Sequence, residues 1–159
     1  FGDVDSLSFL KHILRAQPLE YVILSTWCMA MPDCEEIEGW LKRGVIGRLD
    51  LYVGEIFQNQ YGREYAFARD HIATPFGGRV AVFRNHSKVM AGFGKGYDFA
   101  VESSANINTN PRTENTVVTT SRELALFYKE FFDGIKSFNR DFDGWTPYVL
   151  TGKGASDNG

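Results

Sequence analysis

Residues 20–53 read EYVILSTWCMAMPDCEEIEGWLKRGVIGRLDLYV, and this stretch decides the fold class. It opens with a short apolar, β-branched run over 20–27, whose length suits a buried strand better than a helix. The sequence Met-Pro-Asp at 31–33 is expected to interrupt the regular secondary structure. Asp33 then caps a helix over 34–43 that is acidic at its start and basic at its end. With a second apolar run at its end, the stretch predicts a strand–helix–strand unit, which is typical of α/β proteins.

The alternation of helices and strands extends on both sides of this stretch. An N-terminal helix capped near Asp5 is expected to end at Pro18, and another helix is expected over much of 57–70. A glycine-rich turn at 92–96 predicts a β-hairpin, so some strands are antiparallel. The remaining expected elements are strands over 48–53, 79–84, 87–91, 97–101 and 117–119 and a helix from 121 to about 138. The predicted fold is therefore α/β, a mixed β-sheet flanked by helices, over residues 1–150, with a flexible tail over 151–159.

Length and composition restrict the class of protein. A chain of 159 residues is one ordinary domain, and 43% hydrophobic and 23% charged residues are normal for a globular protein. No apolar run approaches the roughly 18 residues that a membrane helix needs, so stable membrane insertion is not expected. The two cysteines and three scattered histidines form no zinc pattern, and neither a metal nor a cofactor is expected. We expect a reducing, cytoplasmic compartment.

Charge is distributed unevenly along the chain. The net charge is −3, which argues against a protein that coats nucleic acid. Residues 61–112 nevertheless carry seven bases and four acids, whereas both flanking parts are acidic. This local excess fits an anionic substrate at one site, although an excess of this size also arises by chance.

Reactive side chains gather in residues 84–118, RNHSKVMAGFGKGYDFAVESSANINTNPRTENTVV. Cleavage of a phosphodiester needs a nucleophile, positive charge beside the non-bridging oxygens and an acid for the leaving oxygen. Imidazole, ammonium, hydroxyl, amide and carboxylate groups in one polar segment fit these needs. The alternative is a polar hairpin without chemistry, because a lone His-x-Lys pair is common. The candidate residues are His86, Lys88, Ser104, Asn106 and Glu114.

The His-x-Lys pair, the hairpin, the Ser-x-Asn sequence and the later glutamate together resemble the HxK (HKD) motif of the phospholipase D superfamily. The order of elements also resembles that of small single-motif nucleases of this superfamily and of certain metal-independent restriction enzymes. In that family one motif histidine attacks phosphorus to form a phosphohistidine, and a second histidine protonates the leaving group. No metal is used. The resemblance implies that His86 is nucleophile or acid, that Lys88, Ser104 and Asn106 bind phosphate, and that Glu114 orients His86.

The chain departs from the family motif at two positions. The motif Asp, seven residues after the histidine, is replaced by Phe93, and the glycine before the motif serine is replaced by Ser103. Glu102 is an accessory candidate for the missing acid, with a surface strand residue as the alternative. Arg112 is an accessory candidate for a neighbouring phosphate, with a salt bridge to Glu114 as the alternative.

The chain carries one motif copy, because neither His12 nor His71 has a lysine two residues later. The resemblance therefore implies a homodimer in which a shared active site takes one histidine from each subunit. It also implies a nuclease acting on nucleic acid, DNA rather than RNA, since lipid-acting members are mostly long chains with two motifs. Two alternatives remain open: a binding module that keeps the fold and holds phosphate or a nucleic-acid end, and a phospholipid hydrolase.

Overall fold

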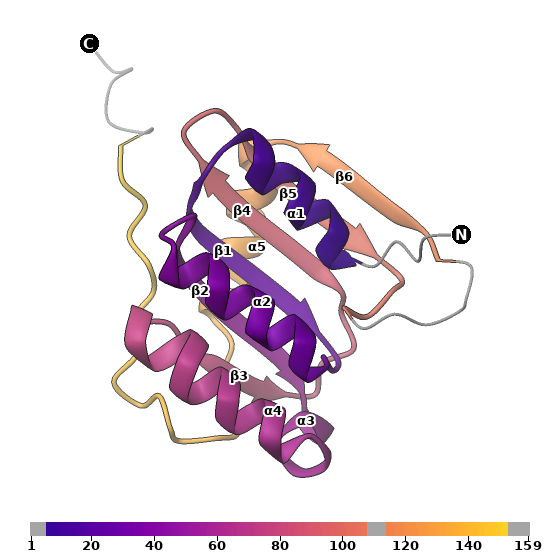
Figure 1. Cartoon of the computed structure of the whole chain (residues 1–159), viewed down its shortest axis with the longest axis vertical. Coiled ribbons are helices and arrows are strands. Elements are labelled where there is room, and N and C mark those ends of the chain that lie inside the picture. Colours follow the sequence, from indigo (N-terminus) through magenta and orange to yellow (C-terminus); the bar gives the residue numbers. More distant parts are fainter. Residues whose placement is uncertain (1–5, 108–113, 153–159) are drawn as a thin grey trace.

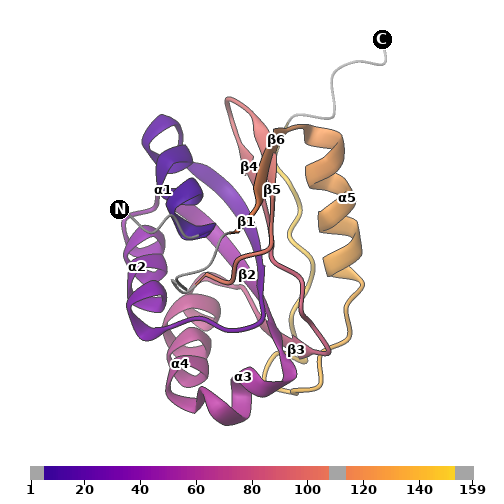
Figure 2. The same ribbon diagram turned by 90° about the vertical axis from the view of Figure 1, so that its right-hand side faces the viewer.

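A computed structural model of the chain describes residues 6–107 and 114–152, and its centre is a mixed six-stranded sheet (Figure 1). The sheet has the strand order β3-β2-β1-β4-β5-β6. Seen edge-on, α1, α2 and α4 cover one face, while α5 and the C-terminal segment cover the other (Figure 2). The strands are β1 (Leu19–Thr26), β2 (Ile46–Gly54), β3 (Val80–Phe83), β4 (Val89–Gly94), β5 (Asp98–Ser103) and β6 (Thr116–Thr120). The α-helices are α1 (Ser6–Ala16), α2 (Met31–Lys42), α3 (Glu55–Gln60), α4 (Gly62–Phe67) and α5 (Arg122–Asp133).

The sheet is divided into a parallel half and an antiparallel half that meet between β1 and β4. β1, β2 and β3 run parallel, and the connections between them carry α2 and then α3 and α4. β4, β5 and β6 form an antiparallel meander, and β4 also pairs antiparallel with β1. The predicted α/β fold with a mixed sheet flanked by helices is therefore confirmed.

The expected interruption of secondary structure at 31–33, before the second helix, was wrong. α2 begins at Met31 and carries Pro32 in its first turn, where a proline loses no intrahelical hydrogen bond. Asp33 does not precede the helix as a cap; its carboxylate reaches back to accept from the Ala30 backbone N–H at 3.1 Å. The same residue types therefore start the helix three positions earlier than the sequence pattern indicated.

Three other expected elements differ from the structure. The helix expected over 57–70 is split at Tyr61 into α3 and α4, and α4 runs on into a π-helical turn, Ala68–Ala73. The last helix ends at Asp133, before Gly134, and not near residue 138. β4 starts at Val89 because the preceding residues form a side-chain-bonded turn. The expected cap residue Asp5 and residues 153–159 of the expected tail lie outside the described residues.

Apolar side chains fill both faces of the sheet. The larger cluster lies beneath α1 and α2, and the smaller one lies beneath α5, where Phe132 packs against Tyr52 with ring centroids 4.6 Å apart. None of the helices within residues 6–107 and 114–152 is long and apolar enough to cross a membrane.

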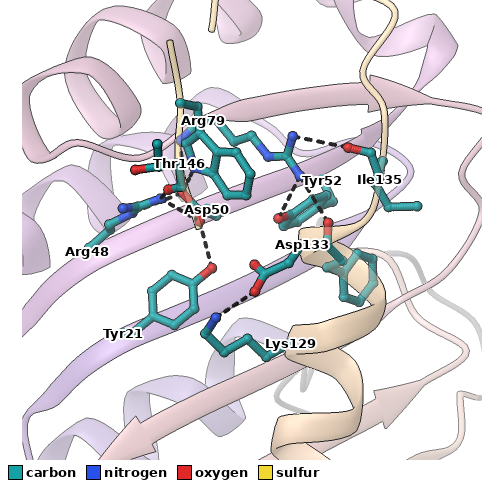
Figure 3. A network of polar contacts seen from close by, with 11 residues as sticks. Tyr21, Arg48, Asp50, Tyr52, Arg79, Lys129, Asp133, Ile135 and Thr146 are labelled. Carbon is teal, nitrogen blue, oxygen red and sulfur yellow. Dashed lines mark hydrogen bonds and ion pairs between the residues drawn. The ribbon is translucent and has the colours of Figure 1, made fainter. Parts of the chain in front are cut away.

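A buried charge network fastens the C-terminal segment to the α5 face of the sheet (Figure 3). Asp50 on β2 is fully buried, and it accepts from the Tyr21 hydroxyl at 2.6 Å and from the Arg79 backbone N–H at 2.9 Å. Arg48 forms an ion pair with the same carboxylate at 3.1 Å, and Trp145 Nε1 donates to it at 3.2 Å. Burial, with the negative charge of Asp50 beside it, raises the pKa of Tyr21, so this phenol remains a donor.

The guanidinium of Arg79 continues the network toward α5. It donates to the backbone oxygens of Phe132 at 3.0 Å and Ile135 at 3.2 Å, at the end of α5 and just beyond it. It also lies 3.6 Å from the centroid of the Trp145 ring, within range of a cation–π contact. The segment after α5 is therefore held by specific contacts although it contains no further helix or strand within the described residues.

Candidate functional site

The predicted site residues come together at one end of the sheet, where four strand ends meet. Ser25 near the end of β1 pairs with Val89 at the start of β4, and Val89 pairs with Glu102 near the end of β5. Ser103 then pairs with Thr116 at the start of β6. The turn that carries His86 and Lys88, the Ser-x-Asn sequence and Glu114 therefore border the same edge of the molecule.

Asn85 anchors the turn that carries His86 and Lys88. Its side chain is buried; Nδ2 donates to Ser25 Oγ at 2.9 Å and to the Tyr52 backbone oxygen at 3.2 Å. Its Oδ1 accepts from the Ser87 backbone N–H at 2.9 Å and from Ser87 Oγ at 2.6 Å. The two bonds to Ser87 form an Asx turn, and the other two fix that turn to β1 and β2.

Ser25 and Ser87 tie the turn to the centre of the sheet. Their hydroxyl oxygens are 2.7 Å apart, although the residues are 62 positions apart in the chain. Sequence reasoning missed the roles of Asn85, Ser25 and Ser87. The one local signal was the Asn-x-Ser pattern, which is typical of a turn in which the Asn side chain bonds the backbone two residues on.

His86 and Lys88 contact each other on the exposed side of this turn. Lys88 Nζ donates to His86 Nδ1 at 3.0 Å and to the His86 backbone oxygen at 2.8 Å. Lys88 Nζ also lies 3.4 Å from His86 Nε2, so the ammonium lies beside both ring nitrogens. The His86 ring lies 5.6 Å from the Trp27 ring, and Trp27 in turn packs on Gly54, where a Cβ would come within 2.4 Å of it. The imidazole is thus positioned by Lys88 on one side and by an indole on another.

Ser104 and Glu114 form a second polar pair across the β5–β6 connection. The Ser104 hydroxyl donates to a Glu114 carboxylate oxygen and accepts from the Asn115 backbone N–H at 2.9 Å. Within the described residues, the hydrogen bonds of His86 go to Lys88 and none goes to Glu114. The structure therefore places Glu114 on Ser104, while the orientation of His86 by Glu114 stays a prediction.

Electrostatics link this second pair to the first. Partial burial lowers the pKa of Lys88, and the negative charge of Glu114 acts in the opposite direction. The ammonium and the carboxylate are therefore close enough to influence each other, although no ion pair joins them in the described part of the chain. A phosphate beside Lys88 would meet its positive charge, while the Ser104 hydroxyl donates its proton to Glu114.

The other predicted site residues lie at varying distances from this centre. Asn106 is half-buried, and its Oδ1 is a buried atom without a hydrogen-bond partner among the residues described. Glu102 accepts from the Tyr128 hydroxyl on the α5 face. Phe93, at the position of the missing motif Asp, is buried and stacks on Tyr21 near the far end of β4. Arg112 lies outside the described residues.

The site is an open surface and not a deep pocket. His86 and Ser104 are exposed, and the cavity beside Lys88, Ser25 and Ser103 measures about 10 Å³, the space of a single water. A cavity of about 640 Å³ lies beyond the opposite end of β1, lined in part by Glu20 and residues of the β4–β5 turn. Within residues 6–107 and 114–152, no group of three or more His, Cys, Asp or Glu side chains is placed to hold a metal ion.

A scan against protein-family models found no matching model, and a search of curated proteins found no match.

Proposed function

We propose that this protein is a metal-independent phosphodiesterase of the phospholipase D type, a nuclease that cleaves through a phosphohistidine at a site shared by two subunits. An imidazole nitrogen of His86 attacks phosphorus, and the bond from phosphorus to the leaving oxygen breaks. The partner subunit's His86 gives its proton to that oxygen. Water then attacks the phosphohistidine, transfers a proton back to the partner subunit's His86 and frees the His86 of the first subunit.

The observation that carries this proposal is the turn held by Asn85. It presents an imidazole and an ammonium in contact with each other, with Nζ 3.0 Å from Nδ1, on a backbone fixed to two strands. A nucleophile with a cation beside it is what attack on an anionic phosphodiester requires, because Lys88 offsets the charge that the non-bridging oxygens develop. Ser104, Asn106 and Glu114 supply further polar contacts from the neighbouring strand end.

The open shape of the site supports its completion by a second subunit. One chain offers one such imidazole at this edge, and a two-fold axis beside it brings a second copy of the same residue. Nucleic acid is the proposed substrate, since a surface site admits a long polymer. DNA is proposed in preference to RNA. The cysteines Cys28 and Cys34 are free and buried, which fits the reducing conditions of the cytoplasm.

The test compares His86→Ala with His12→Ala, a matched control because His12 is an exposed histidine on α1. Both variants and the wild type are incubated in EDTA with labelled single-stranded and double-stranded DNA, with RNA, and with phosphatidylcholine vesicles. We expect DNA cleavage in the wild type and in His12→Ala, and a loss of at least about 1,000-fold in His86→Ala. An acid-labile, base-stable phosphoryl adduct on His86 is expected in quenched reactions.

Other outcomes separate the alternatives. Folded wild type that binds orthovanadate without cleaving any substrate indicates a binding module, for which the buried Phe93 in place of the motif Asp is the supporting observation. Cleavage of the vesicles alone indicates a phospholipid hydrolase. A monomer by light scattering at micromolar concentration, with full activity, contradicts the shared site.

A further inference from the structure

The two edge strands of the sheet differ in whether their outer backbone groups have hydrogen-bond partners. At the β3 edge, the Phe138 backbone N–H donates to the Val82 oxygen at 2.7 Å, and the Val82 N–H donates to Ser137 Oγ at 2.8 Å. Asn139 Nδ2 also donates to the Val80 oxygen at 2.9 Å, so the segment after α5 covers this edge. At the β6 edge, no hydrogen bond within the described residues reaches the outer backbone groups of the strand.

The alternation of hydrogen bonds along β6 shows which of its backbone groups point away from β5. The Ser104 N–H donates to the Asn115 oxygen, and the Ser121 N–H donates to the Asp98 oxygen, so these two residues flanking β6 face β5. Because alternate residues of an antiparallel strand face the same neighbour, Val117 and Thr119 also bond β5. The N–H and C=O groups of Thr116, Val118 and Thr120 therefore point away from the sheet.

Proteins usually protect such an edge, and among the described residues β6 lacks the usual protection. The strand reads TVVTT, without a charge, a proline or a bulge. Val117 is 50% exposed and Val118 is 44% exposed, on opposite faces of the strand. This is a β-branched strand with free hydrogen-bonding groups and apolar side chains on both faces, which is the form of a strand that pairs with another.

Apolar side chains continue this edge on the α5 face. Tyr128 of α5 donates to Glu102 of β5, whereas Lys129 lies over the Tyr21 ring of β1, so the Tyr128 side of the helix faces β6. Phe131, three residues after Tyr128, lies on that same side of the helix. It is 54% exposed, and Phe127 beside it is 61% exposed. The two rings contact Tyr128 and Phe132 of the same helix, and both residues remain more than half exposed near the free edge.

A groove borders the edge on the opposite face. It has a volume of about 410 Å³ and runs between α1 and β6, with Phe9, Ile13 and Val118 among its lining residues. Both faces of the sheet thus present apolar surface directly beside β6.

A second copy of β6 fits this edge in one register. When Val118 lies opposite Val118 of the second copy, Thr116 lies opposite Thr120 of the second copy, and every outward N–H and C=O of both strands finds a partner. The edge is therefore complementary to itself in hydrogen bonding.

We propose that the β6 edge is a two-fold interface on which a second copy of this chain adds its own β6, antiparallel, to form one continuous sheet across both copies. Phe127 and Phe131 of the two copies then pack above the joined strands, and Val118 closes the groove beside α1. The inference rests on the fold and does not depend on the proposed enzymatic activity.

This contact is distinct from the one that a shared active site requires. Antiparallel pairing of β6 sets the two copies of Glu114, and with them the two candidate sites, at opposite ends of the joined strands. A chain that has both two-fold contacts assembles beyond a dimer, because each contact leaves the other available. Loss of the β6 contact therefore reduces the assembly in either case: to a dimer if the shared site is also present, and to a monomer if it is not.

The first test uses Val118→Pro, with Val118→Thr as its matched control. Proline removes the outward N–H, which the monomer does not use, so the fold should tolerate it at this edge position. Threonine keeps both the N–H and the β-branched shape. By light scattering at about 10–100 μM, we expect the molar mass of Val118→Pro to be at least about twofold below that of the wild type and of Val118→Thr. Equal masses in all three, or a wild type that is monomeric in this range, overturn the proposal.

A second test remains decisive if Val118→Pro does not fold. Residues opposite each other in a hydrogen-bonded pair have Cα atoms about 5.5 Å apart, within the usual range of a disulfide. Val118→Cys should therefore form a covalent dimer under mild oxidation by diamide, since Val118 pairs with itself across the axis. Thr119→Cys is the control, because Thr119 pairs with Val117 of the second copy. We expect at least about tenfold less covalent dimer from Thr119→Cys; equal yields, or no dimer from Val118→Cys, contradict the register.

Discussion

Replacement of Asn85 by alanine should unfold part of the candidate site and destabilise the whole protein. The substitution removes four hydrogen bonds at 2.6–3.2 Å from a side chain that is 5% exposed. The Tyr52 carbonyl then loses a partner in the buried interior, and the Ser87 N–H loses its partner in a partly buried turn. A buried polar group without a partner costs about 1–3 kcal/mol, so the two together should lower the free energy of unfolding by about 2–4 kcal/mol.

Urea denaturation followed by circular dichroism measures this loss. With an m-value of about 2 kcal/mol/M, the midpoint should fall by about 1–2 M while the slope stays constant. Asn59→Ala is the matched control, because Asn59 is exposed on α3 and its loss should change stability by less than about 0.5 kcal/mol. A displaced turn also moves His86 and Lys88, and a shift of about 1 Å should cost about 100-fold in any cleavage activity. If Asn85→Ala is as stable as Asn59→Ala, then the side chain of Asn85 does not hold the turn.

Two further predictions concern the surroundings of the turn. Gly54→Ala places a Cβ within 2.4 Å of the Trp27 ring and should destabilise the protein by about 1–3 kcal/mol. The control is Gly62→Ala, whose Cβ meets nothing within 4 Å and which should be neutral or stabilising in thermal melts. Equal effects of the two changes would contradict the packing of Trp27 on Gly54. Glu114→Gln removes the charge that raises the pKa of Lys88, so this pKa should fall below its wild-type value, and the alkaline limb of any activity that needs the ammonium should move to lower pH. Nitrogen-15 NMR of the Lys88 ammonium measures the change directly, and an upward shift would refute the electrostatic link between the two residues.

The fold class could be predicted because its signal is local. The apolar runs that became β1 and β2 have the length and β-branching of buried strands, and the glycine-rich turn identified the β4–β5 hairpin. The start of α2 was wrong because proline has two roles that depend on position. It breaks a helix from within, but it suits the first turn, where its missing N–H is not needed.

The site residues likewise include some that a local pattern could predict and some that it could not. The spacing of His86 and Lys88 indicated that these two side chains lie together, since that contact lies within three residues, although a strand and not a turn was expected from residue 87. The anchors were missed because Asn85 bonds Ser25 and Tyr52, which are 60 and 33 residues away in the chain. Those contacts exist because β1 lies between β2 and β4, and the order of strands in a sheet is set by packing and not by local pattern.

The position of β1 between the two halves of the sheet has a consequence for how the chain folds. The β4–β5 hairpin closes a short loop and forms early, whereas the β1–β4 pairing joins residues far apart in the chain, such as Ser25 and Val89. On a ribosome adding about 5–20 residues per second, roughly 3–12 s pass between the synthesis of β1 and that of β4. During that interval an apolar strand has one open side, and Ser25 and Tyr52 lack the side chain of Asn85 that they later bond. The nascent chain is therefore most exposed to aggregation before the final strands of the sheet have been made, and the site is among its last parts to form.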